Sequence, residues 1–279
     1  MDAFRDKVAV VTGGGSGIGR AVCTELGRRG ARVVVADINA SAASEVAAEI
    51  TTRGGRAENR SVDVTNSEAV EALVAEVVAA HGRIDYMFNN AGIGIAGEER
   101  DVTLDDWQRV LAVNLWGVVH GVRAAYPRML QQGCGHIVNT ASVAGLSPAT
   151  FQGSYTTSKY AVVGLSCALR AEAEAYGVRV SVVCPGIIDT PIVRNIETRG
   201  ASMEHLQSVM VGNMTSPAVC ARAILRGVEK NKPIIVVTGL AFAIWWLTRI
   251  SPRAAIWFWR TAFLGQIRRA IAATPRRAS

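Results

Sequence analysis

The stretch of sequence that decides the fold reads Lys7-Val8-Ala9-Val10-Val11-Thr12-Gly13-Gly14-Gly15-Ser16-Gly17-Ile18-Gly19. Its β-branched run predicts a short buried strand, and its glycine-rich turn leads into a helical pattern over residues 20–29. Glycines at such a turn let the backbone approach a pyrophosphate, and the next helix offers unpaired N–H groups at the positive end of its dipole. The stretch therefore predicts a dinucleotide site, with a ligand-free glycine turn as the alternative.

Strands and helices alternate from this point to residue 238. Further apolar strands are expected over residues 32–36, 57–62, 84–89, 136–140, 179–183 and 233–237, with helices over residues 42–53, 67–81, 104–132, 154–176 and 217–230. Apolar strands separated by helices indicate parallel pairing with both sheet faces covered, which is a doubly wound α/β fold. The helix over 104–132 is expected to break near Val113-Asn114. We predict one domain over residues 1–238, followed by a tail over residues 239–279.

An acidic side chain, Asp37, ends the second strand twenty residues after Gly17. A carboxylate at this position can accept both hydroxyls of an adenosine ribose, and it would repel a 2′-phosphate. Neither Ser16 nor Ile38 supplies a cation that could compensate such a phosphate. The sequence therefore favours NAD over NADP as the cofactor.

Two short segments after the third and fourth strands add candidate cofactor contacts. Asp63, in Val62-Asp63-Val64, has two open interpretations: it accepts from an adenine amino group, or it is an ordinary turn or helix-capping residue. Asn89-Asn90-Ala91-Gly92 combines amides with small residues. This composition suits close packing against a cofactor, although it is also common in turns.

A candidate proton-transfer group lies at Tyr155 and Lys159, with Ser142 upstream. Residues four apart on a helix project from the same face. The phenol pKa of a free tyrosine is about 10, and a nearby ammonium favours the phenolate and lowers that pKa toward neutrality. Tyr, Lys and a hydroxyl donor together can exchange a proton with a substrate oxygen. Taken alone, however, Tyr-x-x-x-Lys is more often a solvated helix face.

Together these motifs resemble the short-chain dehydrogenase/reductase family over residues 7–238. The matching residues are Thr12-Gly13-x-x-x-Gly17-Ile18-Gly19, Asp63, Asn89-Asn90-Ala91-Gly92, Asn114, Ser142, Tyr155-x-x-x-Lys159, Pro185-Gly186 and Thr190. The resemblance implies a Rossmann fold with a seven-stranded parallel sheet in a single domain. It also implies an oxidoreductase with an Asn-Ser-Tyr-Lys catalytic set.

The resemblance assigns a role to each catalytic position. Tyr155 exchanges a proton with the substrate oxygen, and Ser142 hydrogen-bonds the same oxygen. Lys159 binds the nicotinamide ribose and lowers the pKa of Tyr155, while Asn114 holds a water that joins Lys159 to solvent. The backbone of Ile188 contacts the carboxamide, as does the Thr190 side chain. The expected cofactor-binding set is Gly13, Ser16, Gly17, Ile18, Gly19, Asp37, Asp63, Val64, Asn90, Ala91, Gly92, Tyr155, Lys159, Pro185, Gly186, Ile188 and Thr190.

The expected substrate is lipophilic. Residues 186–216 follow the sixth strand, at the carboxyl edge of the sheet, where a lid over the substrate would lie. Mostly apolar residues flank the catalytic motifs, namely Ile93, Ile95, Val143, Leu146 and Phe151. We therefore expect a secondary alcohol or ketone of the steroid, retinoid, terpenoid or long-chain type. The alternative is a non-catalytic NAD-binding interaction protein, which the intact Ser142/Tyr155/Lys159 set argues against.

Charge and cysteine usage limit the partners. The net charge is +7, yet residues 1–229 carry 21 Lys/Arg against 23 Asp/Glu, so the body is near neutral and nucleic-acid binding is not expected. Five scattered cysteines lack metal-ligand spacing and are expected to be reduced thiols, so we predict no metal and a cytoplasmic protein. The apolar strand from Lys7 argues against a signal peptide. By analogy with the family, the long helices suggest a homodimer or homotetramer.

The tail over residues 239–279 is apolar, aromatic and basic. Four of the six tryptophans lie there, and residues 230–279 carry nine Lys/Arg and no acid. The apolar run stops at Arg249, short of the ~20 residues that a membrane-spanning helix needs. Two helices lying on an anionic membrane surface fit this pattern. The competing interpretations are a tail that covers the substrate mouth and a tail that forms a subunit interface.

Overall fold

The computed structural model describes residues 2–200, 214–262, 264, 265 and 268. Seven strands form one parallel sheet in the order β3-β2-β1-β4-β6-β7-β9. The strands are β1 (Val8–Thr12), β2 (Arg32–Asp37), β3 (Arg56–Ser61), β4 (Tyr86–Asn89), β6 (Gly135–Thr140), β7 (Val178–Pro185) and β9 (Ile234–Val237). All five residues of the interior strand β1 are buried, as expected for a strand covered on both faces. The predicted doubly wound α/β sheet is confirmed.

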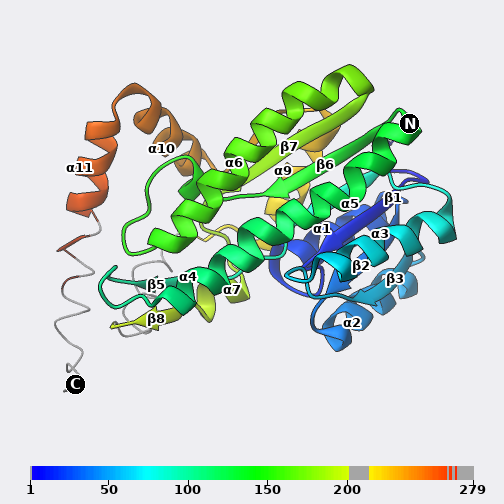
Figure 1. The fold of residues 1–279 in the computed structure, drawn as a ribbon, viewed down its shortest axis with the longest axis horizontal. Coiled ribbons are helices and arrows are strands. Elements are labelled where there is room, and N and C mark those ends of the chain that lie inside the picture. Colours follow the sequence, from blue (N-terminus) through cyan, green and yellow to red (C-terminus); the bar gives the residue numbers. More distant parts are fainter. Residues whose placement is uncertain (1, 201–213, 263, 266–267, 269–279) are drawn as a thin grey trace.

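Helices cover both faces of the sheet, and each face has its own apolar core. One core joins the strands to α3 (Ser67–His81), α5 (Gly117–Gln132) and α6 (Gly153–Ala173). The other joins them to α1 (Gly17–Arg28), α2 (Ala40–Thr52) and α9 (Pro217–Glu229). Figure 1 shows this sandwich of helices around the twisted sheet. The predicted strand and helix spans agree with these elements to within a few residues.

The long helical region is continuous, but its helical repeat changes where the sequence predicted a break. α4 (Leu104–Leu111) leads into a π-helical turn over Ala112–Trp116, and α5 follows at once. A π-turn adds a residue to the helical repeat and frequently marks a functional site. Asn114 lies in this turn and is completely buried.

The predicted lid contains two short elements, α7 (Pro191–Arg194) and β8 (Glu197–Arg199). β8 pairs with β5 (Ile95–Gly97), which follows the fourth sheet strand, in a separate two-stranded sheet. An ion pair anchors β8 to α4, because the Arg199 guanidinium contacts the buried Asp106 carboxylate. Residues 201–213 of the predicted lid lie outside the described residues.

The tail begins as two helices, α10 (Gly239–Ile250) and α11 (Pro252–Ala262), at the opposite end of the molecule from β3 (Figure 1). Both helices pack on the body of the protein. Ala241, Ile244 and Ala255 are buried, and Trp245 lies against the core. Within the described residues, every helix falls short of the length and hydropathy that a membrane crossing requires.

Candidate active site

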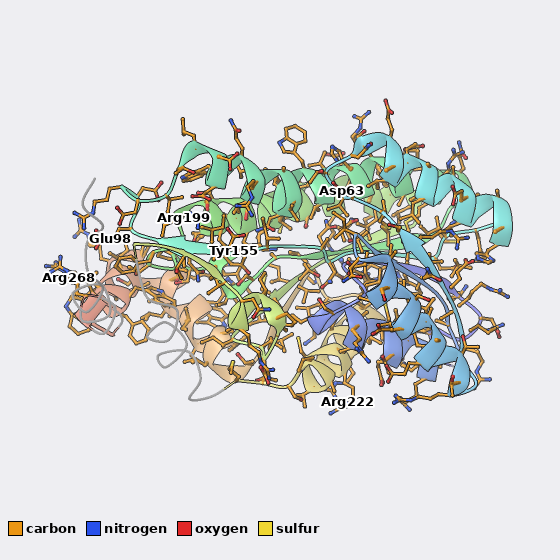
Figure 2. All side chains as sticks on the ribbon, turned by 90° about the horizontal axis from the view of Figure 1, so that it is seen from below. Asp63, Glu98, Tyr155, Arg199, Arg222 and Arg268 are labelled. Atoms are coloured by element: carbon orange, nitrogen blue, oxygen red, sulfur yellow. The ribbon has the colours of Figure 1, made fainter. Side chains whose placement is uncertain are left out.

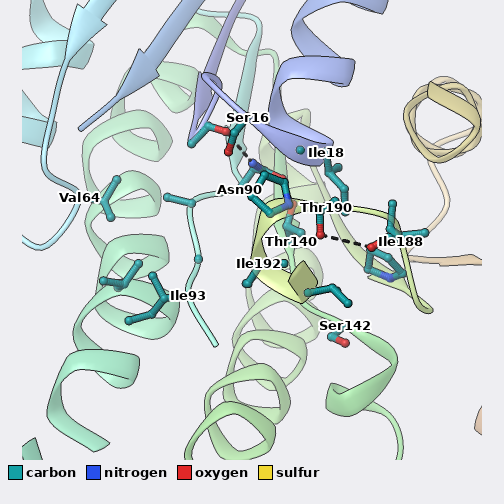
Figure 3. A pocket seen from close by; sticks show the side chains of 18 of the residues that line it. Ser16, Ile18, Val64, Asn90, Ile93, Thr140, Ser142, Ile188, Thr190 and Ile192 are labelled. Carbon is teal, nitrogen blue, oxygen red and sulfur yellow. Dashed lines mark hydrogen bonds between the residues drawn. The ribbon is translucent and has the colours of Figure 1, made fainter. Parts of the chain in front are cut away.

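A cleft of about 370 Å³ opens at the carboxyl ends of β1 and β4, where the strand order reverses. In doubly wound sheets this crevice is where ligands bind. Figure 3 shows side chains from distant parts of the chain, among them Ser16, Asn90, Ser142 and Thr190, around it. Its lining includes every predicted site residue except Gly19 and Asn114. It also includes residues outside the predicted catalytic and cofactor-binding sets: Ile38, Val62, Ile93, Val113, Thr140, Ala141, Pro191, Ile192 and Val193.

The glycine turn is shaped by two close approaches of backbone. Gly13 has a φ of +62°, and a Cβ there would lie 2.8 Å from the Cα of Ala91. A Cβ on Gly19 would overlap the carbonyl oxygen of Gly13. Gly19 therefore acts by packing α1 against the turn rather than by lining the cleft.

The amino-terminal end of α1 has no side-chain cap. Its N-cap residue, Ser16, makes no capping hydrogen bond, whereas the Asn39 and Asn66 side chains cap α2 and α3. The first N–H groups of a helix have no intrahelical partner, and the helix dipole places partial positive charge there. This helix end faces the cleft with its donors available, so it fits the pyrophosphate of a dinucleotide.

The Asp37 carboxylate is fixed at the far end of the turn. Its Oδ2 accepts from the Gly15 backbone N–H at 2.9 Å, and its Oδ1 accepts from the Asn39 N–H at the same distance. Among the described residues that line the cleft, Lys159 is the one cation, and it lies at the catalytic end. Nothing in this lining balances a 2′-phosphate beside Asp37, whereas ribose hydroxyls would find an acceptor there.

Asp63 lines the cleft and also forms a local turn. Its Oδ1 accepts from the Thr65 backbone N–H at 2.9 Å and from the Thr65 hydroxyl at 2.8 Å. These two hydrogen bonds support the interpretation of Asp63 as a turn residue. A contact with an adenine amino group stays a prediction.

The Thr12 hydroxyl fixes the floor of the cleft, a role that the sequence analysis did not assign to it. Thr12 Oγ1 accepts from the backbone N–H groups of Asn90, at 3.0 Å, and Ala91, at 3.2 Å. The Asn90 amide in turn donates to the Thr12 carbonyl at 3.1 Å. These bonds fix the Asn90-Ala91-Gly92 segment against the end of β1. The sequence signal that could have identified this role is the position of Thr12, one residue before the first glycine of the turn.

The catalytic candidates meet on the amino-terminal half of α6. Tyr155 and Lys159 lie one turn apart, with the Lys159 ammonium 5.5 Å from the centroid of the Tyr155 ring. The ammonium donates to the Thr140 carbonyl at 3.0 Å. Ser142, just beyond β6, lines the same cleft as Tyr155. Figure 2 labels Tyr155 between Asp63 and Arg268 in that view.

Burial controls the protonation of this pair. It raises the pKa of the Tyr155 phenol, an effect that the Ser142 hydroxyl partly offsets. Burial also lowers the pKa of the Lys159 ammonium to about 8. The expected lowering of the Tyr155 pKa by Lys159 is therefore not found in this structure, because burial of the phenol is the largest influence on its pKa. A further positive charge in the cleft would be needed to lower it.

The Asn114 side chain hydrogen-bonds protein groups, and its expected water contact stays a prediction. Its amide donates to the Ile93 carbonyl at 3.0 Å and to the Ser158 hydroxyl at 3.2 Å, and its Oδ1 accepts from the Ile93 N–H at 2.8 Å. Both side-chain N–H donors are thus committed to protein partners. The side chain joins the π-turn to the segment after β4 and to α6, so its clearest role here is to position Gly92 and Lys159.

The predicted nicotinamide end lies beside the glycine turn. Thr190 is buried, its hydroxyl donates to the Ile188 carbonyl at 3.3 Å, and its methyl lies 3.2 Å from where a Cβ on Gly17 would be. The end of β7 and the start of α7 are therefore packed directly against the amino-terminal end of α1.

A second, apolar cavity of about 160 Å³ adjoins the cleft. Tyr155 and Ser142 line both spaces. The predicted flanking residues Val143 and Phe151 line the cavity, whereas Leu146 and Ile95 do not. Its lining also includes Trp259 from α11, a contact that the sequence did not locate.

A family model described as short chain dehydrogenase matches residues 7–201. The chain belongs to the short chain dehydrogenase family. A crystal structure of a member of this family from Burkholderia phymatum in complex with NAD has a TM-score of 0.83 and 31% sequence identity, and the match covers 91% of this chain and 96% of that one. A metagenomic short-chain oxidoreductase in complex with NADP has a TM-score of 0.70 and 31% identity, and covers 84% of this chain and 98% of that one.

Two curated relatives of this short chain dehydrogenase are informative. "Probable oxidoreductase EphD" of Mycobacterium tuberculosis is 41% identical over 261 residues, which are 90% of this chain but 44% of that protein. The chain thus spans less than half the length of that relative. Cyclohexanol dehydrogenase of an Acinetobacter species is 36% identical over 222 residues, 79% of this chain and 87% of that protein. The printed names of these two relatives describe a probable oxidoreductase and a dehydrogenase of cyclohexanol.

The lowered pKa of Lys159 predicts a pH-dependent stability. Between about 8 and 10.5 the unfolded chain binds more protons than the folded one, so the free energy of unfolding rises with pH across that window. The cost of burying the ammonium, about 3 kcal/mol, is present below pH 8 and is relieved above it. In a Lys159→Met variant this dependence is absent.

Urea denaturation from pH 7 to pH 10 measures the effect. We expect the free energy of unfolding of Lys159→Met, minus that of the parent, to fall by about 2–3 kcal/mol over this range. The exposed Lys230, changed to Met, is the control. A Lys159→Met difference that stays constant with pH contradicts a depressed pKa.

Proposed function

We propose that this protein is an NAD-dependent oxidoreductase that interconverts a lipophilic secondary alcohol and its ketone. The observation that carries the proposal is the position of Tyr155 and Ser142, which line both the polar cleft and the apolar cavity. A proton-exchanging group at the boundary of a dinucleotide cleft and an apolar space suits hydride transfer between a cofactor and an apolar substrate.

The chain's own residues supply the proton chemistry. Tyr155, as phenolate, takes the proton of the substrate hydroxyl, and the Ser142 hydroxyl donates a hydrogen bond to the same oxygen. NAD, when held in the cleft, would supply the acceptor for the hydride of the substrate carbon. The C–H and O–H bonds of the alcohol break and the C=O bond of the ketone forms, and Tyr155 then passes its proton to solvent. In the reverse direction Tyr155 gives the proton to the carbonyl oxygen.

Lys159 serves as the cation of this site. Its ammonium is held by the Thr140 carbonyl, which leaves two N–H donors for the hydroxyls of a nicotinamide ribose. Burial lowers the pKa of Lys159. Contacts with the ribose favour the charged form, so they would raise this pKa again and keep the amine protonated near neutral pH. Lys159 would thus bind the cofactor and stabilise the Tyr155 phenolate together.

NAD is proposed over NADP because of Asp37. This carboxylate has one oxygen bonded to Gly15 and the other to Asn39, so it is held rigidly where a 2′-phosphate would carry like charge. The solved relatives include one complex with NAD and one with NADP, so the family alone leaves both open.

The lipophilic substrate is proposed from the cavity beside Tyr155. Its wall is formed largely by Val143, Phe151, Ile187, Ile192, Val193 and Ile196. Such a wall offers no charge to a phosphate or carboxylate and favours a hydrocarbon body. The relative that acts on cyclohexanol supports an alicyclic alcohol.

A Tyr155→Phe variant tests the mechanism. We expect its rate of NAD reduction with cyclohexanol and larger lipophilic secondary alcohols to fall by about 10²–10⁴-fold, because the variant has no group that accepts the hydroxyl proton. Its dissociation constant for NAD should stay within a few-fold of the parent value. Absorbance at the NADH band measures the rate, with NADP run in parallel and expected to be the poorer cofactor.

The outcomes separate the competing functions. A variant as active as the parent would refute the role of Tyr155. A parent that binds NAD but oxidises none of the alcohols would favour the non-catalytic interaction protein.

We further propose that this cytoplasmic enzyme binds an anionic membrane surface through its tail. Six large apolar side chains are exposed on α10 and α11, namely Leu240, Phe242, Trp246, Ile250, Ile256 and Trp257. The arginines of the same helices, Arg249, Arg253 and Arg260, have no acidic neighbour in residues 230–279. Exposed aromatics beside unopposed arginines fit an interface with anionic headgroups. The expected homodimer or homotetramer stays a prediction.

Flotation with vesicles tests the membrane proposal. We expect the parent to float with phosphatidylserine-containing vesicles, less so as salt rises, because the arginines are screened. The pair Trp246→Ser and Trp257→Ser should bind roughly tenfold more weakly or worse, since it removes apolar area from the contact. Trp116→Ser is the control, because Trp116 is 55% exposed but lies outside the tail. Equal flotation of all three proteins would contradict the proposal.

A further inference from the structure

Trp259 brings the tail into the substrate cavity. It lies near the end of α11 and shares the lining of the apolar cavity with Tyr155 and Ser142. These residues are more than a hundred positions away in the sequence. The tail helix is therefore part of the wall that a substrate would touch.

The indole of Trp259 is held in a defined orientation. Its Nε1–H donates to the Ser147 hydroxyl at 2.9 Å, and Ser147 is completely buried. Ser147 lies five residues after Ser142, so the bond ties the tail to the segment that carries the catalytic hydroxyl. One helical turn before Trp259, the 1% exposed Ala255 faces the protein, whereas Trp257 is 65% exposed. α11 thus has one face toward the body and another toward solvent.

The size of the cavity limits what fits with the indole in place. A cavity of about 150 Å³ lined by apolar residues accommodates benzene. The cavity here, about 160 Å³, is of that size. It accommodates the body of a one-ring alcohol, and a larger hydrocarbon would need the volume that the Trp259 side chain fills.

We infer that Trp259 sets the upper size limit of the substrate and that the enzyme prefers one-ring secondary alcohols. This inference rests on the proposed function, and it narrows the broad lipophilic class. Trp259 acts as a specificity-determining wall, and Ser147 is its positioning residue. Displacing or shortening the indole joins extra volume to the cavity, and the preference moves toward fused or linked rings.

The test compares the parent with Trp259→Ala and Trp259→Phe on cyclohexanol and on 4-cyclohexylcyclohexanol. For Trp259→Ala we expect kcat/KM to fall roughly tenfold on the one-ring alcohol and to rise roughly tenfold on the two-ring alcohol, mainly through KM. Trp259→Phe keeps an aromatic wall but lacks the N–H, so it should shift the ratio in the same direction by less. Ser147→Ala, which keeps the indole and removes its acceptor, should resemble Trp259→Phe.

A binding measurement provides a readout without turnover. In a Tyr155→Phe background with NAD present, calorimetry with cyclohexanone and 4-cyclohexylcyclohexanone should show the same reversal of preference. Unchanged NAD affinity in every variant shows that the cleft is intact. An unchanged ratio between the two ring sizes, in a parent that oxidises cyclohexanol, overturns the inference about Trp259. A parent inactive on both alcohols instead overturns the proposed function.

Discussion

Two backbone N–H groups at the end of β4 are held by one hydroxyl at the end of β1, that of Thr12. At this point the connection that follows one strand runs to one face of the sheet, and the connection that follows its neighbour runs to the other face. The Thr12 contacts keep the strand ends together while Gly13 turns away at positive φ. The cleft depends on this join: the uncapped end of α1 forms one wall, and the segment after β4 forms the floor beneath Lys159.

The catalytic end is shaped by the cost of burial. Tyr155 and Lys159 are close enough to act together. Burial raises the pKa of Tyr155 and lowers that of Lys159, so it favours the neutral form of each side chain. A site of this kind gains most from a ligand that adds hydrogen-bond acceptors to the ammonium and positive charge near the phenol. The oxidised cofactor proposed here supplies both. Binding of the cofactor would therefore itself lower the pKa of Tyr155 and so activate it.

Much of the fold could be predicted from the sequence because its signals are local. Buried parallel strands appear as apolar runs, and the glycine turn and Asp37 follow the first two strands at recognisable positions. β5 and β8 could not be predicted, because each has three residues and their pairing depends on two distant segments meeting. Trp259 illustrates the same limit, since its contact with Ser147 spans 112 positions. The direction of the Tyr155 pKa also escaped prediction, because burial is a property of the folded chain.

The proposed reaction is a direct hydride transfer from a substrate carbon to a nicotinamide held in the cleft, with Tyr155 taking the proton. Cyclohexanol that carries deuterium on its carbinol carbon tests this transfer when it is incubated with the protein and NAD. In the proton NMR spectrum of the recovered NADH, the signal of one of the two nicotinamide C4 protons should be missing, because deuterium has entered on one face only. NADH that carries only protium at C4, formed while deuterium appears in water, would contradict the account.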